Sequence, residues 1–457
     1  MTTVTALDTE RIEAVSATLS GALFLPWHEH YDAARQVHNG LIDKRPALIA
    51  RCLGTADVVA AIELAHETGL EISVRGGGHS VAGRAVAEGG LMIDLAEMKG
   101  IHVDPVARTA RAQGGVIWRE LNREAAVHGL ATTGGAISTT GIAGFTLGGG
   151  LGWLMSKYGL ATDNLLSAEI VTATGEVLQP SANEHSDLFW AIRGGGGNFG
   201  VATSFEYRLH PVSTVFGGLI AYPFDSAPDV LRLFREFTAT ASDDASMFAG
   251  LVHAPDGSGV KLSALLLCHT GTLEDAEAEF KPVLEFGSPV MTHVGAIPYP
   301  AMNMLLDEGY PKGALNYWKS TFIRALEDDA LDALVASFAE CPSPMDAIVI
   351  EHFHGEVTRI PAAETAVPHR TESYNVLIPG EWIDPADTDG NIAWVRETYA
   401  ALRPYSAERR WLNYFADDDG ADAVRAAYGP NFERLVEIKK RYDPDNIFHL
   451  NHNIEPG

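Results

Sequence analysis

The sequence has few cysteines, an excess of acidic over basic side chains and no long apolar run. Its three cysteines, Cys52, Cys268 and Cys341, lie far apart and form neither a CxxC motif nor a paired framework. This pattern predicts a reducing compartment without structural disulfides. No segment reaches the roughly 18 consecutive apolar residues of a membrane helix, and the N-terminal stretch lacks the basic and apolar regions of a secretory signal. We therefore expect a cytoplasmic protein with no membrane partner.

The charge balance excludes one class of partner. The 33 basic and 60 acidic side chains give a net charge of −27. Nucleic acids and anionic membranes are bound through patches of Lys and Arg, so neither is expected here. A small anionic ligand remains possible, because backbone N–H groups can bind it locally. The sequence leaves the oligomeric state open.

Glycine is abundant, and its distribution divides the chain. Between about residues 40 and 212, short apolar strands alternate with glycine turns and with helices over 57–68 and 118–127. From 213 to 405 glycine is rarer, and helices over 226–241, 272–286 and 329–339 alternate with strands such as 347–354 and 373–378. This second pattern predicts an antiparallel sheet covered on one face by helices. A helix over 420–440 and an extended tail follow.

The sequence thus predicts an α+β fold with two lobes. Residues 40–212 would form the first domain and 213–405 the second. Residues 1–39 would belong to the first lobe, and 406–457 would return to it.

Three glycine clusters carry most of the chemical information: 75–80 (RGGGHS), 148–152 (GGGLG) and 194–200 (GGGGNFG). Glycine lets backbone N–H groups converge on phosphate oxygens, because no Cβ prevents close approach. The clusters do not fit the Rossmann fingerprint, which needs a helix directly after the glycines, and none ends in the Gly-Lys-Ser/Thr of a P-loop. One cluster alone could be a tight turn, but three in one lobe favour a phosphate-bearing ligand.

Long segments around these clusters resemble a known family. They cover 48–83, 89–105, 148–177 and 187–201, the Pro-His-Arg sequence at 368–370, and the ending YDPDNIFHLNHNI at 442–454. Together they resemble the FAD-linked oxidases of the vanillyl-alcohol-oxidase superfamily, which have a PCMH-type FAD-binding domain. Within it they are most similar to the berberine-bridge-enzyme-like branch and its bacterial members related to 6-hydroxy-D-nicotine oxidase. The resemblance is weak only in the middle of the chain.

The resemblance implies a PCMH-type FAD-binding domain, a substrate domain, and FAD held by named residues. The first glycine loop would wrap the diphosphate, Gly200 and Val201 would contact the adenine side, and Asn451 and Asn453 would return to the ring. The implied cofactor contacts are Val74, Arg75, Gly76, Gly77, Gly78, His79, Ser80, Val81, Gly141, Gly144, Gly148, Gly149, Gly150, Asn164, Gly200, Val201, Asn451 and Asn453.

His79 is the implied attachment point of the cofactor, through a ring nitrogen bonded to the 8α-methyl of the isoalloxazine. A neutral imidazole is a nucleophile, which agrees with this role, although His79 could also simply bind a phosphate. Many relatives form a second covalent bond to the flavin from a cysteine. This chain has Ile137 at that position, so we expect the flavin to be attached by a single bond. Thr140 stands where relatives have an apolar residue that gates oxygen.

Two residues are candidates for acid–base catalysis. Tyr414 lies in WLNY (411–414), which resembles a Tyr-x-Asn-Tyr motif whose first tyrosine is Trp411 here. Its hydroxyl could accept the substrate's proton if its pKa were lowered, or it could be part of the core. Glu351 stands near an active-site carboxylate of the nicotine-oxidising relatives. Leu377 replaces a Gln or Glu that several relatives use as a helper base.

Strand alternation leaves the orientation of Glu351 open. In 348–354, Ile350, His352 and His354 share one face, while Val349, Glu351 and Phe353 share the other, and either set could line the cofactor site. The two histidines could suggest a metal pair. No third ligand has suitable spacing, so no metal is expected.

The expected activity is that of an FAD-dependent oxidase with a small-molecule substrate and O2 as partners. A hydride would pass from a substrate C–H to flavin N5 while a base takes the O–H or N–H proton. The substrate would be an amine, an alcohol or sugar, or a natural-product intermediate. The alternatives are a flavin-dependent monooxygenase or oxidative cyclase of a biosynthetic pathway, and a flavin-binding protein without catalysis.

Overall fold

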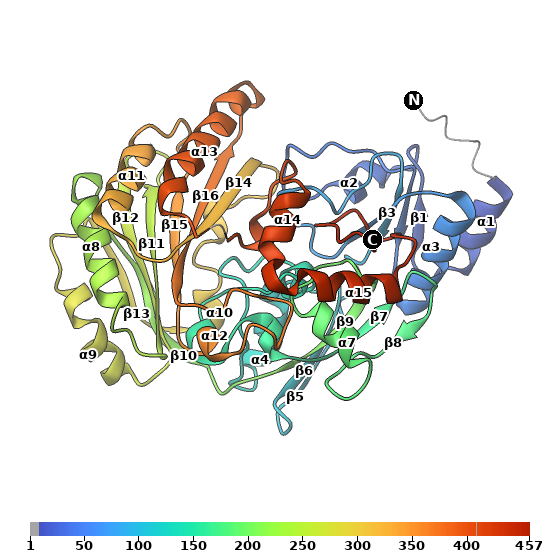
Figure 1. Cartoon of the computed structure of the whole chain (residues 1–457), viewed down its shortest axis with the longest axis horizontal. Coiled ribbons are helices and arrows are strands. Elements are labelled where there is room, and N and C mark those ends of the chain that lie inside the picture. Colours follow the sequence, from blue (N-terminus) through green and yellow to red (C-terminus); the bar gives the residue numbers. More distant parts are fainter. Residues whose placement is uncertain (1–8, 408) are drawn as a thin grey trace.

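Three β-sheets organise the two lobes, which lie side by side along the long axis of the molecule (Figure 1). The computed structural model describes residues 9–407 and 409–457. One lobe contains a four-stranded and a five-stranded sheet, and the other a seven-stranded sheet. Helices and strands pack together in both lobes, so the predicted α+β, two-lobed fold is confirmed. The predicted domain boundaries stay predictions.

The four-stranded sheet presents the first glycine loop. Its order is β1-β2-β4-β3, with β2 and β3 both parallel to β4 and β1 antiparallel to β2. Helix α3 (Thr55–Thr68) makes the crossover and ends at Gly69, whose φ of 67° favours glycine. The strands are β1 (Ala22–Phe24), β2 (Leu48–Arg51), β3 (Ile72–Arg75) and β4 (Leu91–Asp94), and helices α1 (Thr9–Thr18) and α2 (Tyr31–Arg35) flank them.

The five-stranded sheet is antiparallel in the order β5-β6-β9-β7-β8. It packs against Trp118 of α4 and Phe189 of α7 in one buried core. Its strands are β5 (Ile101–Asp104), β6 (Thr109–Gln113), β7 (Leu165–Val171), β8 (Val177–Leu178) and β9 (Val201–Arg208). The helices of this region are α4 (Trp118–Ala126), α5 (Ile142–Leu147), α6 (Met155–Tyr158) and α7 (Ser186–Ile192).

The seven-stranded sheet is antiparallel throughout, in the order β13-β10-β12-β11-β15-β16-β14. Four helices cover its outer face (Figure 1) and share one core with it, as predicted. They are α8 (Ala227–Thr238), α9 (Leu273–Leu284), α11 (Asp328–Ala339) and α13 (Thr388–Leu402). The strands are β10 (Thr214–Pro223), β11 (Ala245–His253), β12 (Lys261–His269), β13 (Met291–Pro298), β14 (Leu315–Ile323), β15 (Ile348–Phe353) and β16 (Ser373–Trp382), and the short helices are α10 (Tyr299–Met302) and α12 (Glu356–Arg359).

The register of β15 decides which of its faces looks towards the first lobe. Ile348 and Ile350 lie in the core beneath the helices. Val349 packs with Trp318 and Leu377 on the opposite face. Because side chains alternate along a strand, Glu351 lies on that opposite face too.

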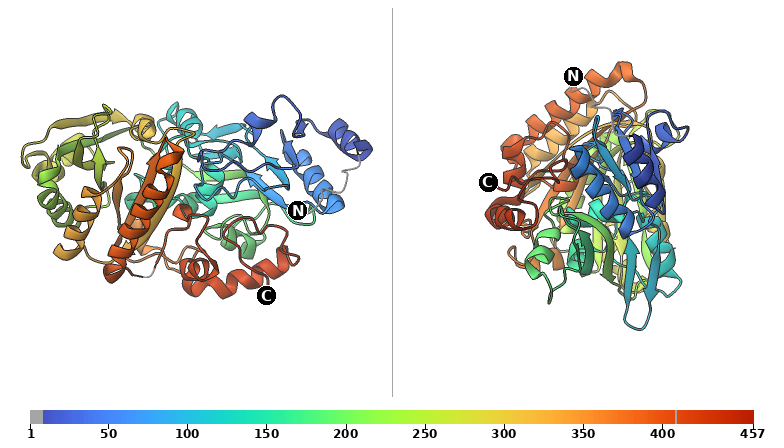
Figure 2. Two further views of the ribbon diagram at one scale, coloured as in Figure 1. Left: turned by 90° about the horizontal axis from the view of Figure 1, so that it is seen from above. Right: turned by 90° about the vertical axis from the view of Figure 1, so that its right-hand side faces the viewer.

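The C-terminal segment returns to the first lobe, alongside α7 (Figures 1 and 2). The single helix expected over 420–440 is wrong, because the structure has two helices, α14 (Ala421–Tyr428) and α15 (Phe432–Tyr442). Gly429, with a φ of 47°, and Pro430 separate them. Neither residue suits a helix interior. In the described part of the chain, no helix is both long and apolar enough to cross a bilayer.

Two buried carboxyl groups lie near the end of β16. Asp346 accepts N–H groups from Glu381 and Ser343, both at 3.0 Å. The carboxyl oxygens of Glu381 have no hydrogen-bond partner among the described residues, and the residue is fully buried. Burial, followed by the charge of Asp346, raises the pKa of Glu381 to about 8. Burial raises the pKa of Asp346 to about 7.

We predict that Glu381→Gln stabilises the protein in a pH-dependent way. Between the ordinary pKa of 4.5 and the folded value of about 8, the folded chain holds a proton on Glu381 that the unfolded chain has lost. Stability therefore falls as pH rises through that window, and glutamine removes this loss. The melting-temperature gain of the variant should grow from about pH 5 to about pH 8 and then level off. The exposed Glu340→Gln is the control; a gain independent of pH would contradict the account.

Candidate active site

A cavity of about 290 Å³ lies where the two lobes and the C-terminal segment meet. The first lobe contributes its glycine loops, the seven-stranded sheet contributes Trp318, and the C-terminal segment contributes residues in 411–414 and 448–452. Most of the lining residues are glycine or apolar. The shape therefore depends on how closely backbone segments approach one another.

The first glycine loop begins where β3 ends. Gly76, Gly77 and Gly78 line the cavity, and Gly78 has a φ of 67°. A Cβ on Gly77 would lie 2.5 Å from the Cα of Gly141, and a Cβ on Gly141 would lie 2.5 Å from the nitrogen of Gly77. The two backbones can touch only if both residues are glycine. This contact joins the loop after β3 to the segment before α5.

His79 projects into the cavity from this loop. It is half-buried, and its ring stacks on the ring of His38 with centroids 3.9 Å apart and planes inclined by 15°. Its Nε2 lies 3.4 Å from the hydroxyl of Thr139. Burial, and then the neighbouring His38, lowers the pKa of His79 to about 3. The imidazole is therefore neutral near pH 7 and keeps a nitrogen lone pair.

The second glycine cluster receives side chains from the C-terminal segment. Asn413 donates to the carbonyl oxygens of Gly144 and Phe145, both at 3.2 Å. Gly148 lines the cavity, where a Cβ would meet Asn413 at 2.5 Å. Gly149 and Gly150 lie behind it, packed against the rings of Trp411 and Phe145. The cluster thus makes room for side chains as well as for a ligand.

The third glycine cluster meets the C-terminal tail. Gly196, Gly197 and Gly200 line the cavity together with Asn451 and His452. The Asn451 amide donates to the carbonyl oxygen of Gly197 at 3.1 Å. The buried Lys439 fixes the tail by donating to the carbonyl oxygens of Asn198 and Phe448.

Several polar atoms at this wall lack partners. Arg84 Nε, Asn451 Oδ1 and His452 Nδ1 are buried without a hydrogen bond within the described residues. Buried polar groups are nearly always hydrogen-bonded. A cofactor with phosphate and carbonyl groups would supply the missing partners, and the glycine cradle leaves it space. The residues present therefore fit FAD.

A buried carboxyl lies beside the cavity on the side of the seven-stranded sheet. Tyr414 lines the cavity and donates its hydroxyl to Glu351 Oε1 at 2.8 Å. Asn375 donates to Glu351 Oε2 at 2.6 Å. Burial raises the pKa of Glu351 to about 7, although both hydrogen bonds oppose the rise. Burial and the Glu351 carboxylate raise the pKa of Tyr414 well above 10.

Most of the residues that the sequence predicted for the cofactor converge on the cavity. The predicted residues that line it are Val74, Gly76, Gly77, Gly78, His79, Ser80, Gly141, Gly144, Gly148, Gly200, Asn451 and, for catalysis, Tyr414. Those that the structure places behind the wall are Arg75, Val81, Gly149, Gly150, Asn164, Val201, Asn453 and Glu351. Arg75 turns away to form a two-point ion pair with Asp94, and Val201 packs in the core of the four-stranded sheet.

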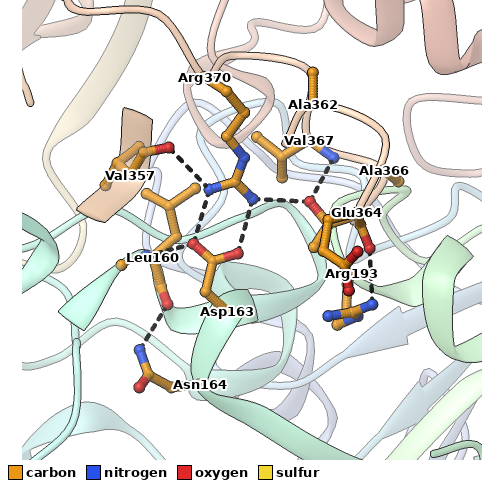
Figure 3. Close-up of polar contacts among 12 residues, drawn as sticks. Leu160, Asp163, Asn164, Arg193, Val357, Ala362, Glu364, Ala366, Val367 and Arg370 are labelled. Atoms are coloured by element: carbon orange, nitrogen blue, oxygen red, sulfur yellow. Dashed lines mark hydrogen bonds and ion pairs between the residues drawn. The ribbon is translucent and has the colours of Figure 1, made fainter. Parts of the chain in front are cut away.

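Asn164 does not line the cavity, and Figure 3 shows its amide bonded to the carbonyl oxygen of Leu160 instead. Its amide donates to the carbonyl oxygens of Tyr158 and Leu160, and its oxygen lies 2.7 Å from His210 Nε2. Both polar atoms of its side chain are thus used inside the first lobe. The side chain of Asn164 thus does not line this cavity, and its contact with the cofactor stays a prediction.

The Pro-His-Arg sequence joins the lobes next to Asn164. The Arg370 guanidinium forms two hydrogen bonds with Asp163, at 2.7 and 2.8 Å, and another with the Thr365 hydroxyl at 2.8 Å (Figure 3). Both ionic side chains are buried. Removing one partner of such a pair leaves an uncompensated buried charge, so the pair fixes the segment after α12 on the first lobe.

Sequence reasoning missed several residues of the site. Asn413 stood inside the quoted segment 411–414, and Arg84 directly follows the quoted segment 48–83, so a search of these segments and their ends for polar side chains would have found both. Trp318 and Asn375 lie in the middle of the chain, where the resemblance is weak. No sequence signal identified His38.

Comparisons with known proteins identify the family of the chain. Residues 46–181 match the FAD binding domain family, and residues 411–455 match the berberine and berberine-like family. The chain is 33% identical to (R)-6-hydroxynicotine oxidase of Paenarthrobacter nicotinovorans, over 97% of this chain and 98% of that one. The chain belongs to the berberine-bridge-like family of FAD-linked oxidoreductases.

Solved structures of the family show the same fold. The crystal structure of 6-hydroxy-D-nicotine oxidase from Arthrobacter nicotinovorans superposes with a TM-score of 0.87 at 30% identity, covering 96% of this chain and 99% of that chain. A BBE-like protein of Physcomitrella patens superposes with a TM-score of 0.89 at 22% identity, covering 97% and 99%. The resemblance read from the sequence is confirmed, and the chain is an FAD-linked oxidoreductase.

We predict that Gly77→Ala reduces FAD loading. The added Cβ would collide with the backbone of Gly141, and overpacking of this kind costs about 1–3 kcal/mol. The flavin-to-protein absorbance ratio should fall well below that of the parent. The control is Gly54→Ala, because Gly54 has extended backbone and open space around its Cβ position. Equal loading of the two variants would show that the contact does not shape the cofactor site.

Proposed function

We propose that this protein is an FAD-dependent oxidase for a small organic molecule, with FAD bonded once, through His79, and O2 as the electron acceptor. The main support for this proposal is the hydrogen-bond network of Tyr414, Glu351 and Asn375 at the wall of the cavity into which His79 projects. A carboxyl beside a cofactor cradle supports a role for this network in accepting a proton. This intact network favours catalysis over flavin binding alone.

FAD, when bound, would accept a hydride from a C–H of the substrate. His79 would hold it by a bond from a ring nitrogen, for which the low pKa is favourable because the ring keeps a free lone pair at neutral pH. Stacking on His38 fixes the plane of the ring. Ile137 lines the cavity where a second attachment would need a thiol. The three cysteines are buried elsewhere, which supports a single bond.

Glu351 is the better candidate for the proton acceptor. Its pKa of about 7 lets it ionise near neutral pH, and a base works best when its pKa lies near the working pH. Tyr414 has its pKa raised by burial and by the Glu351 charge, so it holds its proton. We propose that the Tyr414 hydroxyl, which contacts both the cavity and the carboxylate, conveys the substrate's proton to Glu351.

The side chains around Glu351 suggest the substrate class. Val81, Trp318 and Leu377 form a buried apolar cluster with Tyr310 and Tyr414 packed against it. The Trp318 ring meets those of Tyr310 and Tyr414 edge to face. A carbon-rich wall with a carboxyl favours a neutral or cationic molecule with an O–H or N–H beside an oxidisable C–H. An amine, an alcohol or sugar, or a natural-product intermediate fits, and the hydroxynicotine oxidase relative supports an amine.

We predict that acid denaturation leaves the flavin on the chain and that digestion yields one flavin-bearing peptide, containing His79. His79→Ala should fold and bind FAD through the glycine cradle, but release it in acid. Absorbance of the precipitated protein and peptide mass measure both outcomes. Flavin released from the parent by acid would refute the bond, and a second flavin-bearing peptide would refute single attachment.

We predict that Glu351→Gln lowers the rate of anaerobic flavin reduction by an oxidisable substrate by about 10²–10⁴-fold. In the parent, this rate should rise with pH through about 7, because Glu351 must lose its proton before it can accept another. Glutamine keeps a similar shape and cannot ionise, so this step in the pH profile should disappear.

Tyr414→Phe separates the two candidate bases. The variant loses a hydrogen bond that lowers the pKa of Glu351. The step in its pH profile should therefore move to higher pH and keep its shape. The rate should fall by about 10–100-fold, as expected for one hydrogen bond to a charged group. If instead the parent profile has no step near 7 and only Tyr414→Phe abolishes reduction, Tyr414 is the base.

A further inference from the structure

We propose that Arg84 is the side chain whose positive charge balances the negative charge of FAD in the cavity. That charge belongs to the diphosphate or to the isoalloxazine ring in its reduced form. The inference rests on the proposed cofactor site but not on the bond to His79.

Arg84 differs in charge from the other residues of the cavity wall. Among the described residues that line the cavity, it is the only Lys, Arg, Asp or Glu. The two histidines that line it, His79 and His452, each have a pKa lowered to about 3, first of all by burial, and are neutral near pH 7. The whole chain has a net charge of −27. Arg84 is therefore the one full charge near pH 7 among the described residues that line the cavity of an acidic protein.

The contacts of Arg84 hold it in place and leave donors free. Nη1 donates to the carbonyl oxygen of Asn451 at 2.8 Å, which ties the guanidinium to the C-terminal tail. Nε is buried without a partner within the described residues. A guanidinium has five N–H donors and stays charged in proteins, so most of its capacity is unused here.

The surrounding carboxylates do not neutralise Arg84. No described carboxylate lies within ion-pair distance of it. Asp417 and Asp419 act on it only through their charge. Asp419 is bound to Lys319 at 2.8 Å and to Arg410. Arg84 is half-buried, and a cation that is partly removed from water without a nearby anion is costly, so the site is suited to a ligand that brings negative charge.

The glycine loop alone would not balance a charged ligand. Its backbone N–H groups supply partial charges, whereas the diphosphate of FAD carries two full negative charges. Electrostatic interactions inside a protein cavity are stronger than in water, so one guanidinium makes a measurable difference there. The same charge near the isoalloxazine would stabilise the reduced ring more than the oxidised one.

Three measurements test the proposal. Dilution of FAD-loaded His79→Ala protein, followed by the fluorescence of released FAD, gives the FAD dissociation constant. Displacement of that FAD by ADP gives the ADP dissociation constant. Equilibration of the holoenzyme with a redox dye gives the ratio of reduced to oxidised flavin.

Arg84→Gln should change these quantities in one of two patterns. If Arg84 faces the diphosphate, the dissociation constants of FAD and ADP both rise about tenfold or more. If it faces the isoalloxazine, ADP binding is unchanged and the redox equilibrium shifts about tenfold or more towards oxidised flavin. Arg84→Lys keeps the charge and should stay much closer to the parent.

The exposed Arg123→Gln is the matched control, since it removes the same charge from a guanidinium that is 82% exposed on α4 of the same lobe. The proposal is overturned if Arg84→Gln equals this control in all three measurements. If Arg84→Gln does not fold, Arg84→Lys decides. Parent-like dissociation constants and redox equilibrium in Arg84→Lys would support the role of the charge. A change of about tenfold, although the charge is retained, would assign the effect to the Asn451 contact and overturn the proposal.

Discussion

The contact between Gly77 and Gly141 is the constraint on which the rest of the site depends. It brings the loop after β3 against the segment before α5, and neither residue can carry a side chain there. The loop after β3 presents His79 towards the cavity, and stacking on His38 fixes the ring of His79. Glycine at these positions leaves space for a phosphate-bearing ligand to approach backbone N–H groups. One covalent detail of the sequence, the absence of two Cβ atoms, thus determines the shape of the cradle.

The cradle is completed by segments that are distant in the sequence. Asn413 reaches the second glycine cluster, and Lys439 anchors the tail that carries Asn451 and His452. Arg370 and Asp163 fix the segment after α12 to the first lobe. These contacts place the open face of the seven-stranded sheet, with Glu351, beside the loop that carries His79. The cofactor cradle and the carboxyl of Glu351 therefore come from different lobes and meet only in the folded chain.

The sequence predicted those features that depend on local patterns. The glycine loops, the helices of both lobes and the antiparallel sheet follow from short-range periodicity and from the backbone freedom of glycine, and most predicted cofactor residues converge on one cavity. The break at Gly429 was missed because the apolar pattern continues across it. The choice between the two faces of β15, and the pairing of Tyr414 with Glu351, depend on how residues far apart in the chain come together. The contact of the Asn164 side chain with His210, 46 residues further along the chain, could likewise not be read from the sequence.

The pKa values of the two candidate bases support our proposal that Glu351, and not Tyr414, accepts the proton. A tyrosine in a recognisable motif attracts attention, yet burial beside a carboxylate makes its proton harder to remove. The same burial brings the carboxyl of Glu351 to a pKa at which it can act near neutrality. Arg84, which no motif emphasised, becomes notable only when the charges around the cavity are compared.

The central claim is that this cavity joins FAD to a substrate that can be oxidised beside Glu351. Anaerobic mixing of the flavin-loaded protein with a panel of amines, sugars, alcohols and phenols tests it most directly. The account predicts that at least one neutral or cationic compound bleaches the flavin absorbance, that Glu351→Gln suppresses the bleaching, and that air restores the colour. A loaded protein that no member of the panel reduces, or one that is reduced equally well without the Glu351 carboxyl, would contradict it.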